Sequence, residues 1–273
     1  MTPGIRVYRY GIHRGEENLV IGNRKAGMVN FSGCHLSCGF CYTPETSVLN
    51  QGLNMTEDEL YGVLEDLRSA GAGNWNFISP SHLWRWLEPV LHRLRIAAQS
   101  QLGTSQGELP LILKISGFET EKLVRRMAAF ASVFVPDFKV WDEEAARNSH
   151  LPARYGEVAL RAIEIMMETH PPIWSDQGEL LRGVLVRHLV MPGYLADSLK
   201  VIENLGEIRF QGVLNIMTYF HDVKRARLVR AHANDIWMLI EKASEMGDVT
   251  LLIDGKLPGS ERGFSKEAAY VTT

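Results

Sequence analysis

The sequence predicts an α/β fold, in the form of a barrel or part-barrel of parallel strands. Short apolar runs rich in β-branched residues alternate about six times with longer stretches in which apolar residues recur every three to four positions. This alternation is typical of repeated strand–helix units, which form parallel sheets. In addition, polar side chains follow most of the apolar runs, at the strand ends where such barrels carry their functional groups.

Each strand is predicted from one of the short apolar runs. The strands are expected at residues 27–31, 75–79, 111–115, 133–138, 183–190, 213–217 and 249–254. The first helix starts with a capping box, because Thr56 is followed three residues later by Glu59 and then by an apolar stripe. The remaining helices show the same three-to-four spacing and are expected at 82–98, 119–131, 156–168, 196–205 and 233–246.

The alternation continues across two polar segments rich in helix and strand breakers, 99–107 and 170–178. We therefore expect surface insertions at these places, the second of which is a candidate lid, and a single domain spanning 1–273. Its core lies at about 22–226, and a C-terminal helix, strand and tail occupy 227–273. The tail after Leu257 is expected to be loosely structured.

The composition is that of an ordinary globular protein. The 273 residues are 45% apolar and 22% charged, with a formal net charge of −3, which excludes disordered and collagen-like chains. This charge balance predicts no nucleic-acid or anionic-membrane partner. There is no signal-peptide core near the N-terminus and no apolar run of about 18 residues, so a cytoplasmic location is expected.

All three cysteines of the chain, Cys34, Cys38 and Cys41, lie within eight residues. An odd number of such close neighbours is a poor disulfide framework, so a metal site is the better interpretation. Three thiolates can hold an iron–sulfur cluster with one iron left for another ligand. The alternatives are a redox thiol or a zinc ion, with a histidine as fourth ligand, but His35 is too close to Cys34 for usual zinc spacing.

The segment Cys34-x-x-x-Cys38-x-Phe40-Cys41 resembles the signature of the radical S-adenosylmethionine (SAM) enzymes. The resemblance implies a partial (β/α)6 TIM-like barrel and an oxygen-sensitive oxidoreductase. It also implies that the three cysteines ligate three irons of a 4Fe-4S cluster while SAM chelates the fourth. One electron then cleaves SAM to methionine and a 5′-deoxyadenosyl radical, which abstracts hydrogen from a substrate. Phe40 would pack near the adenine.

Over about 22–226 the chain resembles the pyruvate formate-lyase activating enzymes and, more closely, their uncharacterised iron–sulfur relatives. The matching segments are 31–34, 74–82, 115–118, 135–139, 186–193 and 215–219. By this resemblance Asp137 and Lys139 lie beside SAM, and Arg187 lies near its carboxylate. The residues themselves also allow a plain Asp137–Lys139 salt bridge, and they favour an anion near Arg187 because it interrupts an apolar strand.

The chain departs from these families at several positions. The Gly-Gly-Glu segment that holds the SAM amino group is absent, and Ser79, Ser81 and His82 stand in its place. Lys114 replaces an Asp of the activating enzymes. The expected cofactor contacts are Phe40, Ser79, Ser81, His82, Ser116, Asp137, Lys139, Arg187, Asn215 and His221, and no catalytic residue is expected beyond the cluster ligands.

The resemblance implies three kinds of partner: SAM, an electron donor such as flavodoxin or ferredoxin, and a hydrogen donor. The hydrogen donor is a glycine of a glycyl-radical enzyme if the protein is an activase. The first alternative is a tailoring enzyme for a small molecule or peptide. A non-catalytic zinc or electron-carrier module is the second alternative, and it predicts a metal site indifferent to SAM.

Overall fold

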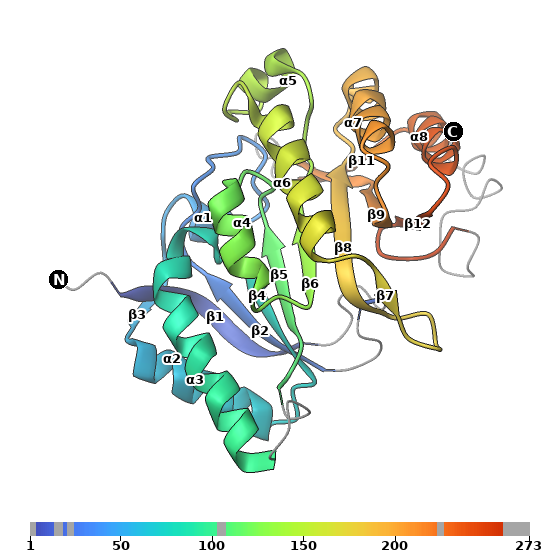
Figure 1. Ribbon diagram of the computed structural model, residues 1–273. Coiled ribbons are helices and arrows are strands. Elements are labelled where there is room, and N and C mark those ends of the chain that lie inside the picture. The colour runs from blue at the N-terminus through green and yellow to red at the C-terminus, as the bar shows by residue number, and fades with distance from the viewer. Residues whose placement is uncertain (1–3, 14–18, 21–24, 103–107, 223–226, 259–273) are drawn as a thin grey trace.

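The structure is a computed structural model that describes residues 4–13, 19–20, 25–102, 108–222 and 227–258. Strands and helices alternate along most of the chain (Figure 1). The strands are β1 (Ile5–His13), β2 (Ala26–Phe31), β3 (Leu53–Met55), β4 (Asn74–Ile78), β5 (Leu111–Ile115), β6 (Val133–Pro136), β7 (Ile173–Trp174), β8 (Leu180–Leu189), β9 (Gly212–Met217), β10 (Tyr219–Asp222), β11 (Arg227–Arg230) and β12 (Val249–Ile253). The helices are α1 (Pro44–Ser47), α2 (Glu57–Ser69), a 3-10 turn η1 (Ser81–Leu83), α3 (Trp84–Leu102), α4 (Glu121–Ala128), α5 (Glu143–Asn148), α6 (Tyr155–Thr169), α7 (Leu195–Glu207) and α8 (Ala233–Ser244).

The main sheet has the order β12-β9-β8-β6-β5-β4-β2-β1-β3, and its neighbours from β12 to β2 all pair in parallel. Strands β1 and β3 extend the β2 edge in antiparallel fashion. Helices cover the outer face of the curved sheet (Figure 1). The prediction of a partial barrel of parallel strands is therefore confirmed.

Alternation of side chains along each strand separates two faces. The outward face, which includes Phe31, Phe77 and Phe134, packs against the helices in one large core. The inward face begins with a small cluster, here called the apolar floor, at the end of the barrel where the strands start. The apolar floor consists of Val20, Ile112, Val133, Val135, Leu180, Leu185, Val213 and Leu252. Two residues further along the same strands, the charged Lys114, Asp137 and Arg187 follow Ile112, Val135 and Leu185.

Local sequence explains where the helices begin. The predicted capping box of α2 is present, because Thr56 accepts from the Glu59 N–H and the Glu59 carboxylate accepts from the Thr56 N–H. Helix α4 begins two residues later than predicted, because Thr120 is its N-cap and accepts from the Leu123 N–H. Glu119 therefore precedes the helix.

The structure corrects two expectations. Strand β1 was not predicted, although buried Ile5 and Val7 alternate with partly buried residues as in a half-buried strand. The segment 170–178 contains β7 and the turn into β8, at the opposite end of β8 from Arg187 (Figure 1). The seven steps along the strand from Leu180 to Arg187 span about 23 Å, so the expectation of a lid is wrong.

Two other expectations concern the chain ends and the membrane. The tail predicted after Leu257 falls mostly outside the described residues, which end at 258. Within the described residues, no helix combines the length and apolarity needed to cross a bilayer.

Candidate active site

The carboxyl ends of β4, β5, β6 and β8 surround a cavity of about 320 Å³. This volume lies at the lower limit of typical small-molecule sites. The strands contribute Ser79, Lys114, Ser116, Asp137 and Arg187 to its lining, because parallel strands deliver their carboxyl ends to one edge. The loop after β2 closes the cavity with Cys34, Leu36, Cys38, Phe40 and Cys41. All three thiols of the chain therefore share one cavity with a set of charged side chains.

Backbone contacts and hydrogen bonds hold the cysteine loop in place. The Gly39 N–H donates to the Ser149 carbonyl at 2.9 Å, and the Leu36 N–H donates to the Cys34 sulfur at 3.4 Å. The Cys41 sulfur lies 2.9 Å from the Ser47 hydroxyl. A side chain at position 39 would collide with His150, so the loop passes close to that residue.

The environment of the thiols favours their neutral form when no metal is bound. Burial raises the pKa of Cys38 to about 11, and the neighbouring Cys34 and Cys41 act in the same direction while Lys139 opposes them. Burial also raises the pKa of Cys34. Within the described part of the chain, no three His, Cys, Asp or Glu side chains converge closely enough to hold one metal ion.

Asp137 lies between two cations in the lining of the cavity. Its Oδ1 accepts from Arg187 Nε at 2.7 Å, and its Oδ2 accepts from Lys139 Nζ at 2.6 Å. Burial disfavours the charged carboxylate, but Arg187 and Lys139 outweigh burial and leave the pKa of Asp137 below its usual value. The predicted Asp137–Lys139 ion pair is thus present, and both residues also line the cavity.

Lys114 is a third cation of the same wall. Its side chain is almost fully buried, at 6% exposure, although it lines the cavity. Burial, together with the nearby Arg187, lowers the pKa of Lys114 to about 7, and Asp137 only partly opposes them.

Glu119, the first residue of a helix expected from the sequence at 119–131, is a buried carboxylate. Its Oε1 accepts from the hydroxyls of Ser81 and Ser116, both at 2.8 Å, whereas Oε2 is buried without a hydrogen-bond partner. Burial raises the pKa of Glu119, and the serine hydrogen bonds oppose that effect. His35 Nε2 lies 2.8 Å from the Ser116 hydroxyl. This network links the cysteine loop to the ends of β4 and β5.

Tyr155, the first residue of α6, joins the carboxyl ends of β5 and β6. Its hydroxyl lies 2.7 Å from the carbonyl oxygens of both Ser116 and Asp137, and it accepts from the Lys139 N–H at 3.2 Å. Gly117 permits this close approach, because it has a φ of +83° and a Cβ there would collide with the Asp137 carbonyl. The position of Asp137 thus depends on a tyrosine that sequence reasoning did not identify.

The expected cofactor contacts divide into two groups. Phe40, Ser79, Ser116, Asp137, Lys139 and Arg187 line the cavity. Ser81 and His82 do not: Ser81 binds Glu119, and His82 Nε2 lies 2.9 Å from the Ser32 carbonyl. Asn215 is buried and accepts from the Gly255 N–H at 3.0 Å. The side chain of His221 lies outside the described part of the chain.

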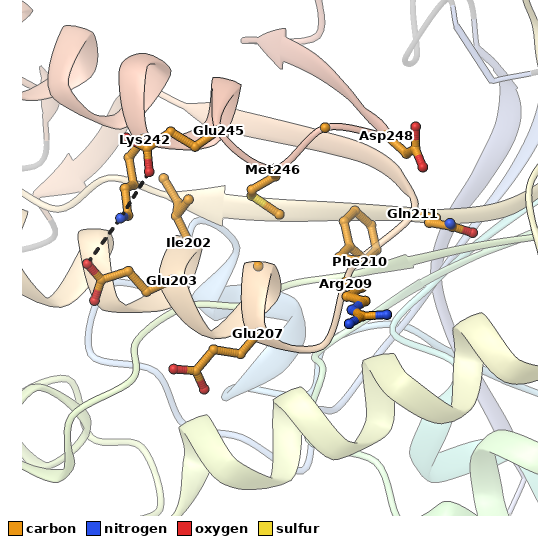
Figure 2. Close-up of a pocket in the computed structure, with 12 residues that line it drawn as sticks. Ile202, Glu203, Glu207, Arg209, Phe210, Gln211, Lys242, Glu245, Met246 and Asp248 are labelled. Atoms are coloured by element: carbon orange, nitrogen blue, oxygen red, sulfur yellow. Dashed lines mark hydrogen bonds and ion pairs between the residues drawn. The ribbon is translucent and has the colours of Figure 1, made fainter.

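A larger cavity, of about 780 Å³, lies between α7 and α8 near the starts of β9 and β12 (Figure 2). It is an open groove far from the cysteines. Its charged groups include Glu203, Lys242 and Glu245, and Lys242 bridges the two carboxylates at 3.5 and 3.2 Å. The groove has no cysteine in its lining. The smaller cavity holds all three thiols together with the charged carboxyl ends of the strands, so it is the better candidate for chemistry.

No protein-family model matches the sequence, and no curated protein sequence matches it. Solved structures do match. SuiB from Streptococcus suis, bound to S-adenosylmethionine, superposes with a TM-score of 0.54 and 10% identity, over 81% of this chain and 48% of SuiB. TsrM from Kitasatospora setae, a radical S-adenosylmethionine methyltransferase, superposes with a TM-score of 0.50 and 13% identity, over 72% of this chain and 36% of TsrM.

The chain has the fold of the radical SAM enzymes. It spans between a third and a half of the length of SuiB and TsrM, so it matches only part of each. A domain of a pyruvate-formate lyase-activating enzyme from Bacteroides vulgatus superposes with a TM-score of 0.46 and 15% identity, over 66% of this chain and 99% of that domain. The superposition on TsrM confirms, for the fold, the resemblance predicted from the cysteine motif.

Proposed function

We propose that this protein is a radical SAM enzyme that holds a 4Fe-4S cluster on Cys34, Cys38 and Cys41 and binds SAM beside it. The observation that carries this proposal is that all three thiols of the chain open onto one cavity lined by charged strand ends. The fold shared with SuiB and TsrM supports it.

The arrangement of the thiols suits a cluster better than a zinc ion. In a zinc site the sulfurs converge on one atom at about 2.3 Å, and hence lie about 3.8 Å from one another. The described residues include no such convergent group. In a cluster each thiolate ligates a different iron, so the sulfurs stand further apart. Three thiolates also leave one iron available to the amino and carboxylate groups of SAM.

The strand-end residues bind and orient SAM in this proposal. Arg187 and Lys139 carry two positive charges against the single negative charge of Asp137, so the SAM carboxylate fits beside Arg187. Ser79 and Ser116 offer hydroxyls to the polar groups of SAM. Phe40, whose ring centroid lies 5.8 Å from that of Phe220, gives the adenine an apolar surface and excludes water.

When bound, the cluster supplies one electron that cleaves SAM to methionine and a 5′-deoxyadenosyl radical, which takes a hydrogen atom from the substrate. The chain has no cysteine left for a second cluster. The electron therefore comes from a separate donor protein, such as flavodoxin or ferredoxin. The hydrogen donor is either a glycine of a partner enzyme or a small molecule or peptide.

Anaerobic reconstitution tests the proposal. The wild-type chain is expected to bind about four irons and four sulfides, to give a reduced-cluster electron paramagnetic resonance signal that changes when SAM is added, and to release 5′-deoxyadenosine. Alanine in place of any one of Cys34, Cys38 or Cys41 is expected to abolish product. Ser244→Ala, on the exposed surface of α8, is the matched control. Stoichiometric zinc, or a cluster signal that is indifferent to SAM, would refute the proposal.

The same technique separates the two substrate classes. Incubation with a glycyl-radical enzyme leaves a persistent protein radical only if this protein is an activase. With a small-molecule or peptide substrate, 5′-deoxyadenosine accumulates with no such radical.

A further inference from the structure

The cysteine loop is followed directly by a short helix that returns to it. Thr43 is the N-cap of α1 and Pro44 is its first residue, a position at which proline favours the start of a helix. The last residue of this helix, Ser47, lines the same cavity as Cys41. The chain therefore places a hydroxyl group beside the last of its three sulfurs.

Helix α1 is held against the start of the cysteine loop. The Gly33 N–H donates to the Thr46 carbonyl at 2.8 Å, and Thr46 is only 3% exposed. The hydroxyl of Ser47 lies on this anchored helix, with its oxygen 2.9 Å from the Cys41 sulfur. The backbone of the loop itself therefore fixes the distance between the hydroxyl and the sulfur.

The direction of this bond follows from the single hydrogen of the Ser47 hydroxyl. The hydroxyl donates to the Thr43 carbonyl at 3.0 Å, so it accepts from the Cys41 thiol while that thiol carries its proton. A thiolate that ligates iron has no hydrogen and is only an acceptor. To keep the contact with such a thiolate, the Ser47 hydroxyl has to turn its hydrogen toward the sulfur.

The Thr43 carbonyl does not need the Ser47 hydroxyl. It also accepts from the N–H groups of Thr46 and Ser47, both at 3.1 Å, and from the Thr46 hydroxyl at 2.8 Å. A carbonyl oxygen has two lone pairs, so these donors already satisfy it. Rotation of the Ser47 hydroxyl toward the sulfur therefore leaves no buried polar group without a partner.

Hydrogen bonds to the ligating sulfurs are one of the determinants of the reduction potential of an iron–sulfur cluster. A donor stabilises the reduced cluster more than the oxidised one, because the reduced cluster carries one more negative charge. Among the described residues, the other hydrogen bond to a cysteine sulfur comes from the Leu36 N–H, which lies 3.4 Å from the Cys34 sulfur. The bond from Ser47 is shorter, and it comes from a side chain that can be replaced.

We propose that the Ser47 hydroxyl donates a hydrogen bond to the Cys41 thiolate and raises the reduction potential of the cluster. This inference rests on the proposed function, because it assigns the control of the potential at that same site. Ser47 acts through a ligand of the cluster and is therefore a positioning residue. Its effect is a cluster that accepts an electron from a donor protein of less negative potential.

The test is an anaerobic redox titration of the reconstituted full-length chain, followed by electron paramagnetic resonance without SAM. Ser47→Ala and Ser47→Val are expected to make the equilibrium constant for reduction about threefold to tenfold smaller, which lowers the midpoint potential by about 30–60 mV for a one-electron couple. Ser47→Thr keeps the hydroxyl and is expected to keep the wild-type potential.

Thr46→Val is the matched control. It removes the neighbouring hydroxyl of the same helix, which donates to the Thr43 carbonyl rather than to a sulfur. Its midpoint potential is expected to equal that of the wild-type chain. Iron and sulfide analysis and a thermal melt of each variant show that the compared chains are folded and equally loaded.

Three results would overturn the inference. The first is an equal potential for Ser47→Thr and Ser47→Val, which have the same shape. The second is an equal fall in Thr46→Val, which would assign the effect to the integrity of α1. The third is loss of the cluster from both variants that lack the hydroxyl while Ser47→Thr keeps it, because Ser47 would then act in assembly and not on the potential.

Failure here is distinguishable from failure of the proposed function. If the wild-type chain holds a cluster and cleaves SAM but the potentials of the variants do not differ, only the role of Ser47 falls. If the wild-type chain forms no cluster and SAM is not cleaved, the proposed function falls and this inference falls with it.

Discussion

Asp137→Asn removes the charge that separates two buried cations. Unit charges about 4 Å apart attract by about 4 kcal/mol at an effective dielectric constant of 20, so the pairs with Arg187 and Lys139 amount to about 8 kcal/mol before desolvation. Desolvation offsets much of this, and removing one partner of a buried pair costs about 3–5 kcal/mol. The Asp137 side chain is 22% exposed, so we expect the lower limit, about 3 kcal/mol.

Urea unfolding, followed by circular dichroism, measures this loss. With a slope of about 3 kcal/mol per molar urea, the midpoint is expected to fall by about 1 M without a change in slope. Adding Arg187→Met to Asp137→Asn removes one of the two cations that have lost their carboxylate. The double variant is therefore expected to be destabilised by less than the sum of the two single variants. An unchanged midpoint, or additive effects of the two substitutions, would show that the charges are not coupled and would refute the reasoning.

Three further predictions concern the strand ends. His188 is buried and its Nδ1–H donates to the Phe138 carbonyl at 2.8 Å, and burial lowers the pKa of His188 to about 4. Stability is therefore full above pH 6.5 and falls by about 3 kcal/mol as pH drops from 6.5 to 4. The unfolding free energy of His188→Leu, measured across this range, is expected to lack that slope. Tyr155→Phe is expected to destabilise the fold by about 1–3 kcal/mol, measured by urea unfolding, because buried strand-end carbonyls lose their hydroxyl partner, and an unchanged midpoint would contradict this. Gly117→Ala is expected to lower the melting temperature much more than Gly178→Ala, because both have positive φ but only Gly117 has a carbonyl in the way; equal melting temperatures would count against the steric argument.

The parallel strands of the barrel were predictable because strands buried on both faces are nearly continuous apolar runs. Strand β1 was missed because it lies in the antiparallel part of the sheet, between β2 and β3, where only alternate residues such as Ile5 and Val7 are buried. The position of 170–178 was misjudged for a different reason. Its polar composition indicates exposure, but it contains no information on which end of the barrel the segment occupies.

The residues of the site also divide into those that the local sequence predicts and those that only the folded structure brings together. The spacing of Asp137 and Lys139 predicts a shared face, and the pattern around Arg187 predicts a buried cation, because both properties are local. The role of Glu119 depends on Ser81, 38 residues away, and that contact exists only once β4 and β5 pair. Tyr155 reaches back to two strands that precede it. Such contacts follow from packing, which a single sequence does not display.

The apolar floor also affects the order in which parts of the chain fold. It joins Val20, near the beginning of the described chain, to Leu180 through a parallel bridge, and it needs Leu252 from the last strand of the sheet. Contacts between residues so distant in sequence form late, because loop closure must precede them. A chain still being synthesised thus has its cysteine loop long before it has these core contacts. Under the proposed function, a cluster inserted after the whole chain has folded would therefore be better shielded from water and oxygen.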